Sequence, residues 1–191
     1  MLRTRRALLA GALVTLLSFS LLGTALAGPG IRVNPWSYDP DNTGIISAAW
    51  VTQEGLPDAG NSNHALFLQK DGPTTANAAA GATVSGAEGQ ELTELGFDIR
   101  NDSYCGAGAP RFNVVTTDGV THFFGCMYGT HTDLGNGWTQ VRFAPEDAFP
   151  PVVPGSTIQS IDIVLDEGPA SVYLDNIDVN GSIAGKPGKS K

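Results

Sequence analysis

Basic residues, cysteine and histidine are scarce in this chain of 191 residues. Lys and Arg number 11 against 19 Asp and Glu, so the formal net charge is −8, and there are 3 His and 2 Cys. Because clusters of Lys and Arg bind nucleic acids and anionic membrane surfaces, this balance disfavours both partners. The sequence also lacks a nucleophile elbow, a phosphate loop and a paired-carboxylate signature, so we predict no catalytic residues and no enzyme activity.

Long apolar runs are missing too, except at the N-terminus. Arg3, Arg5 and Arg6 precede the apolar segment 7–22, and the small residues 25–27 follow it. This order is typical of a secretory signal peptide, so we expect residues 1–27 to be removed and the protein to be secreted or extracytoplasmic. A retained membrane anchor and export by a twin-arginine route are the alternatives. The remainder suits a single domain.

Two cysteines, Cys105 and Cys126, stand without any C-x-x-C or H-x-x-x-H motif. In an oxidising compartment such a pair is more often a disulfide than a metal site. We therefore predict a Cys105–Cys126 bond, which would close a loop of about 20 residues and stabilise the fold by about 3 kcal/mol.

Short apolar runs with a period of two dominate the rest of the chain, and Gly- and Pro-rich loops separate them. No helical period is visible, which predicts an all-β protein, an antiparallel β-sandwich of about eight strands. We expect an irregular lead-in at 28–44, the sandwich at 45–181 and a flexible basic tail at 182–191. The expected strands are 45–51, 65–70, 82–85, 92–100, 111–117, 120–126, 138–143 and a hairpin pair within 157–181.

The last pair carries a change of phase. Val172 and Leu174 fall on even numbers whereas Ile177 and Val179 fall on odd ones, which predicts a β-bulge near 175–176.

The dipeptide Asp118–Gly119 predicts a tight hairpin with a two-residue turn. In that register Phe112 faces Gly125 and points into the core, whereas Asn113 faces Phe124 on the outer surface.

Several segments resemble one group of proteins. They are I-x-I-V-L-D and Y-L-D-N-I near the C-terminus, and L-G-F-D-I-R-N-D, C-G-A-G-A-P-R-F-N-V and W-T-Q-V-R-F before them. These segments resemble exported bacterial jelly-roll proteins of the galactose-binding-like fold, which include carbohydrate-binding modules and relatives of undefined function. The resemblance implies the fold and a carbohydrate-binding role, and it supplies no catalytic residues.

Polar residues of several strands are the candidates for one ligand-binding sheet face, provided that these strands are neighbours. Amides, guanidinium groups and an aromatic ring suit a hydroxyl-rich ligand. The alternative is a solvated face of cross-strand ion pairs. The candidates are Asp98, Arg100, Arg111, Asn113, His122, Phe124, Gln140 and Arg142.

The resemblance also implies a structural calcium ion at Asp175, with Asp39 and Asp41 as upstream ligands. Hydrogen bonding of Asp175 to the lead-in is the alternative.

From the resemblance and the candidate ligand residues we expect an exported, non-catalytic binding module for carbohydrate. The other classes are a structural or protein-interaction protein of the cell envelope and a polysaccharide-acting hydrolase or lyase.

Overall fold

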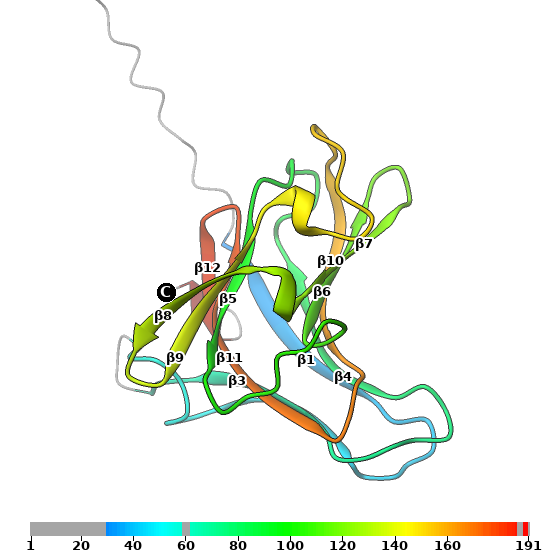
Figure 1. The fold of residues 1–191 in the computed structure, drawn as a ribbon, viewed down its shortest axis with the longest axis vertical. Coiled ribbons are helices and arrows are strands. Elements are labelled where there is room, and N and C mark those ends of the chain that lie inside the picture. Colours follow the sequence, from blue (N-terminus) through cyan, green and yellow to red (C-terminus); the bar gives the residue numbers. More distant parts are fainter. Residues whose placement is uncertain (1–29, 59–61, 187–188, 191) are drawn as a thin grey trace, which may run out of the picture.

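The computed structural model describes residues 30–58, 62–186 and 189–190, so the predicted signal peptide, residues 1–27, lies outside it. The described chain is an antiparallel β-sandwich with two facing sheets, which confirms the predicted fold class (Figure 1). The five-stranded sheet has the order β1-β4-β10-β6-β7, with bounds Arg32–Tyr38, Ala79–Ser85, Ile158–Leu165, Arg111–Thr116 and Thr121–Gly125.

The eight-stranded sheet has the order β13-β12-β11-β5-β9-β8; in addition, β3 pairs with β11, and β2 pairs with β3. Its bounds are Lys189–Ser190, Ser182–Lys186, Ala170–Val179, Leu95–Arg100, Trp138–Phe143, Thr130–Gly135, Ala65–Lys70 (β3) and Ile46–Val51 (β2). Short 3-10 turns are the helical elements of the described chain, and none of its helices has the length and apolar run that a membrane crossing needs.

The core lies between the two sheets and consists of the inward-facing residues, which alternate along each strand with outward-facing ones. Phe97 of β5 packs on Phe112 of β6, with ring centroids 5.5 Å apart, and Phe143 of β9 packs on Phe124 of β7 at 5.9 Å. These four rings join the two sheets and are fully buried. The inward position predicted for Phe112 is confirmed.

The pair of strands at 157–181 is not a hairpin. β10 lies between β4 and β6 in one sheet, whereas β11 lies beside β5 in the other, so the chain crosses between the sheets after Leu165. Both strands alternate apolar residues, and alternation shows which face is buried but does not name the partner strand. The bulge is confirmed: the register of β11 against β5 shifts between Asp175 and Asp178, and Asn176 has φ +45°.

The predicted register of the β6–β7 hairpin is wrong by one residue. The Thr116 N–H donates to the Val120 carbonyl at 3.0 Å, so the loop holds three residues and ends at Gly119 with φ +83°. Phe112 therefore pairs with Phe124. Because a shift of one residue turns a strand over, Phe124 is buried and Phe123 is 40% exposed.

Both ends of the domain carry more structure than expected. The lead-in contains β1, which pairs with β4 along its whole length, and the tail begins with β12, which pairs with the end of β11. Ala184 in β12 is fully buried. The prolines of the lead-in and the Gly/Lys composition of the tail favoured irregular chain, but each segment lies along a strand that pairs with it. The count of about eight strands was therefore too low.

Candidate functional site

The predicted ligand residues do not share one surface. The five-stranded sheet contains Arg111 and Asn113, both on β6. The eight-stranded sheet contains Asp98 and Arg100 on β5 and Gln140 and Arg142 on β9. The two groups therefore belong to the two different sheets of the sandwich. The expected single face, which required neighbouring strands, is wrong.

Arg100 is used in ion pairs on the eight-stranded sheet. Its guanidinium contacts Glu54 at 2.6 Å and Asp102 at 2.7 Å, and it lies 3.5 Å from the centroid of the Tyr173 ring. The hydrogen bond and charge of Arg100 lower the pKa of Asp102. This is the solvated, ion-paired arrangement that was the alternative to a ligand site.

Arg142 lies between two buried carboxylates. Its guanidinium is 3.6 Å from Asp98 and 3.7 Å from Asp178, and Asp98 also accepts a hydrogen bond of 2.6 Å from Asn176. Burial raises the pKa of Asp178 against the opposing effect of Arg142. Within the described chain, Oδ1 of Asp98 has no hydrogen-bond partner, so Arg142 is its compensating charge. Gln140 pairs with Asp98 across β5 and β9.

Two candidates on β7 point inward, as the corrected register requires. Phe124 belongs to the core, and His122 is 3% exposed. The His122 ring lies 2.7 Å from the Pro150 carbonyl, to which Nδ1 donates, and 3.1 Å from the Thr116 hydroxyl. His122 therefore ties the hairpin to the 149–154 segment, and its side chain is not available to a ligand.

An open groove of about 560 Å³ lies instead beside β7. Three exposed aromatic rings line it: Phe123 is 40% exposed, Tyr128 is 62% and Phe149 is 79%. Its remaining lining residues are Ala107, Gly108, Arg111, Gly125 and Asp147. A concave apolar surface with two charged side chains is the usual composition of a small-molecule site.

The floor of the groove depends on a glycine and on the disulfide. A side chain at position 125 would collide with the Ala107 carbonyl, so Gly125 allows the loop after Cys105 to lie against β7. Cys105 and Cys126 are bonded with Cα atoms 5.3 Å apart, which confirms the predicted pairing. Cys126 directly follows Gly125, and the bond therefore attaches this loop beside Tyr128.

The opposite wall comes from the segment after the second 3-10 turn (Pro145–Asp147). Phe149 forms a two-way backbone bridge with Phe123, with N–H···O distances of 2.9 and 3.0 Å. The carboxylate of Asp147 accepts the Ala144 N–H at 2.8 Å. The bridge holds the backbone of Phe149 against β7, and its side chain stays 79% exposed.

Arg111 is the cation of the groove, and its charge is already matched. The guanidinium donates to both oxygens of Asp166 at 2.6 and 2.7 Å and to Asn113 at 2.8 Å, and it lies 5.7 Å from the Phe123 ring centroid. The bond to Arg111 lowers the pKa of Asp166. Arg111 therefore adds little net positive charge to the groove.

The three carboxylates proposed for calcium are not brought together. The backbone N–H of Gly44 lowers the pKa of Asp39, and Asp41 accepts hydrogen bonds from Thr75 at 2.6 Å and the Ala76 N–H at 3.1 Å. Asp175 is fully buried and accepts N–H groups from Leu56 at 2.8 Å and Asn176 at 2.7 Å. Hydrogen bonds thus organise the bulge at Asp175, and one of their donors, the Leu56 N–H, belongs to the loop after β2.

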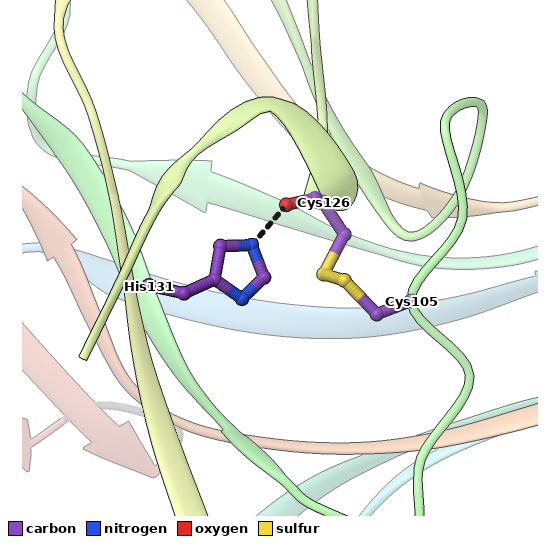
Figure 2. A group of neighbouring side chains, drawn as sticks. All are labelled: Cys105, Cys126 and His131. Carbon is purple, nitrogen blue, oxygen red and sulfur yellow. Dashed lines mark hydrogen bonds between the residues drawn. A yellow bond between two sulfur atoms is a disulfide. The ribbon is translucent and has the colours of Figure 1, made fainter. Parts of the chain in front are cut away.

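One group of three metal-type ligand atoms within 4.8 Å occurs among the described residues, and it consists of Cys105, Cys126 and His131. Figure 2 shows that the two sulfur atoms are bonded to each other and that the His131 ring points to the Cys126 carbonyl, at 2.9 Å. Metal-binding sulfur is a thiolate, so the oxidised pair does not offer such ligands.

Comparison with known proteins provides no family for the chain. No protein-family model matches it, and no curated protein matches it. Among solved structures, it is similar to the crystal structure of a β-1,2-glucanase from Parabacteroides distasonis, with a TM-score of 0.42 and 15% identity. The match covers 78% of this chain and 22% of the glucanase chain, so the chain spans about a fifth of that protein. A similarity this low carries no argument about function.

Sequence reasoning found Arg111 but missed Phe123 and Phe149 as site residues. The wrong register placed Phe123 in the core, and Phe149 lies among prolines in a segment that carries no periodic pattern. A three-residue loop ending at Gly119 would have given the correct register for Phe123, because glycine at the last loop position is common in such hairpins. Tyr128, in the short 3-10 turn after β7, also lines the groove.

Proposed function

We propose that this protein is an exported, non-catalytic module of the jelly-roll, galactose-binding-like type, and that it binds a neutral carbohydrate in the aromatic groove. The observation that carries this proposal is the set of three exposed rings, Phe123, Tyr128 and Phe149, around one cavity. Large apolar side chains are seldom left exposed together on a soluble protein without a partner.

The chemistry of the groove fits a sugar ring. A pyranose has an apolar face of C–H groups, which packs on an aromatic ring, and a rim of hydroxyls, which need hydrogen-bond partners. Arg111 and Asp147 line the same cavity and supply a donor and an acceptor. Because Asp166 already neutralises Arg111, the groove favours an uncharged sugar over an acidic one.

A second candidate function is the binding of another protein. Met127 is 56% exposed and adjoins Tyr128, so the apolar surface continues beyond the groove. Methionine and aromatic residues are enriched in the centres of protein interfaces.

The test is a binding assay of the mature protein against soluble and insoluble neutral polysaccharides. We expect Phe123→Ala to weaken binding about tenfold, which corresponds to the loss of about 1.4 kcal/mol. Leu134→Ala is the matched control, because Leu134 is also 40% exposed but lies on β8 of the other sheet.

Equal binding by the two variants would contradict the groove as the site. Absence of binding to every neutral glycan would contradict the carbohydrate proposal and favour the protein-binding alternative. Release of soluble sugar from a polysaccharide would instead support the hydrolase or lyase class.

A further inference from the structure

A second pocket, of about 370 Å³, lies at the end of the sandwich where β1 and β3 finish and β4 begins. Tyr38 at the end of β1 pairs with Ala79 at the start of β4, which brings the two segments together (Figure 1). The lining differs from that of the aromatic groove, because it consists mainly of polar groups. The residues used here are Tyr38, Lys70, Thr74, Thr75, Asn77 and Asp166.

Lys70 is the unusual residue of this pocket, because it is charged and only 8% exposed. Its ammonium donates to the Asp166 carbonyl at 2.7 Å and to the Ala78 carbonyl at 3.0 Å. An ammonium group has three N–H donors, and in the described part of the chain these two carbonyls are its hydrogen-bond partners. One donor of a buried cation is thus left for a ligand.

The charge of Lys70 is also poorly compensated. Both acceptors are neutral carbonyl oxygens, and within the described residues no carboxylate lies within ion-pair distance of its Nζ atom. The carboxylate of Asp166 attracts it from farther away, but Arg111 holds both oxygens of that carboxylate. A buried charge without a close counter-charge is costly, so an incoming anion would be favoured there.

The rest of the pocket suits a hydroxylated ring. Thr74 and Asn77 contribute a hydroxyl and an amide, and the ring of Tyr38, 56% exposed, forms an aromatic edge. Asp41 fixes this loop through its hydrogen bonds to Thr75 and to the Ala76 N–H. The conformation of this loop is therefore stabilised by hydrogen bonds within the protein and does not depend on a ligand.

We propose that this pocket binds the carboxylate of a sugar acid, with Lys70 as the cation and the Thr74, Asn77 and Tyr38 side chains around the ring. One ammonium matches the single charge of a carboxylate better than the double charge of a phosphate monoester, especially in a chain of net charge −8. The volume exceeds that of a simple carboxylate ion and accommodates the attached ring. This proposal does not rest on the function of the aromatic groove.

The experiment is a titration of the mature protein with D-glucuronate, followed by amide chemical shifts in NMR spectra. We expect saturable shifts in residues 74–79 and at Lys70, and no such shifts with methyl glucoside, which is neutral. Acetate tests whether a carboxylate alone suffices. Equal affinity for acetate and glucuronate would overturn the sugar part of the proposal, and no saturable shift with glucuronate would overturn the site.

Two substitutions separate the roles. Lys70→Met should abolish binding, but Lys70 is buried and its loss could affect folding. Asn77→Asp places a negative charge on an exposed rim position and should weaken glucuronate binding at least tenfold. Asn136→Asp, the same charge change in the exposed turn before β9, is the matched control and should leave the affinity within twofold.

Equal weakening by Asn77→Asp and Asn136→Asp would show a general charge effect and overturn the proposal. Phe123→Ala should leave glucuronate binding unchanged, so failure of the aromatic groove as a sugar site and failure of this pocket give different results.

Discussion

The adjacent residues Phe123 and Phe124 allow a direct test of the sheet register. Phe124 is fully buried and its ring lies 5.9 Å from that of Phe143, whereas Phe123 is 40% exposed on the outer surface. Truncating a buried phenylalanine to alanine costs about 3–5 kcal/mol, because transfer energy is lost and a cavity remains. For a domain of this size, that corresponds to a fall in melting temperature of about 6–20 °C.

Phe123→Ala should behave differently, with a change of about 1 kcal/mol or less in the free energy of unfolding, because its outer edge is already solvated. Urea unfolding followed by tryptophan fluorescence measures both variants under the same conditions. If Phe123→Ala were as destabilising as Phe124→Ala, or more so, the two-residue turn would be correct and the orientation of β7 described above would be wrong.

Four further predictions concern the disulfide and the carboxylates. Replacing Cys105 and Cys126 together by alanine should lower the unfolding free energy by about 3 kcal/mol, as expected for a sequence separation of 21, and a loss below about 1 kcal/mol would contradict a stabilising role. Asp166→Asn should cost about 1 kcal/mol at pH 7. Because the folded-state pKa of Asp166 is lowered, its contribution is present above pH 3.8 and disappears as pH falls through the folded-state pKa, so the variant and the parent should converge in acid. Burial raises the folded-state pKa of Asp178, so its destabilising effect develops as pH rises above 3.8 and is complete above the folded-state pKa. Asp178→Asn should therefore be at least as stable as the parent at pH 7, and a marked loss of stability would refute this. Excess chelator should leave the melting temperature unchanged, because N–H groups already bind Asp175, and a fall of several degrees would instead support calcium there.

Sequence patterns predicted those features that depend on residues within a single strand or on the cysteine count. The even-to-odd change between Leu174 and Ile177 predicted the bulge, because apolar residues on one strand must all face the same core. The disulfide was predicted from the number of cysteines and the expected oxidising compartment. It joins Cys105, in the loop after β5, to Cys126, which directly follows β7.

Pairing between strands was not predictable in the same way. The outer residues of β5, β6 and β9 look alike in sequence, but β5 and β9 pair with each other while β6 lies in the opposite sheet. Sheet membership depends on long-range packing, which a period of two does not encode. The proposed ligand face failed for this reason.

The aromatic groove was outside the reach of sequence patterns for a different reason. Its rings come from a strand, a 3-10 turn and an irregular segment, and the disulfide and the Phe123–Phe149 bridge connect these parts of the chain. The Lys70 pocket likewise joins the ends of β1 and β3 to the segment after β10. Neither site has a spacing that could be recognised along the chain.

The Phe123–Phe149 bridge also closes one border of the five-stranded sheet. β7 is its last strand, and the outer N–H and C=O groups of a last strand can pair with a strand of another molecule. The bridge occupies the middle of that border, and Pro150 and Pro151, which lack an N–H, follow at once. The 148–151 segment therefore prevents β7 from pairing with a strand of another molecule. Proteolytic cleavage of this segment should expose the β7 edge and promote aggregation.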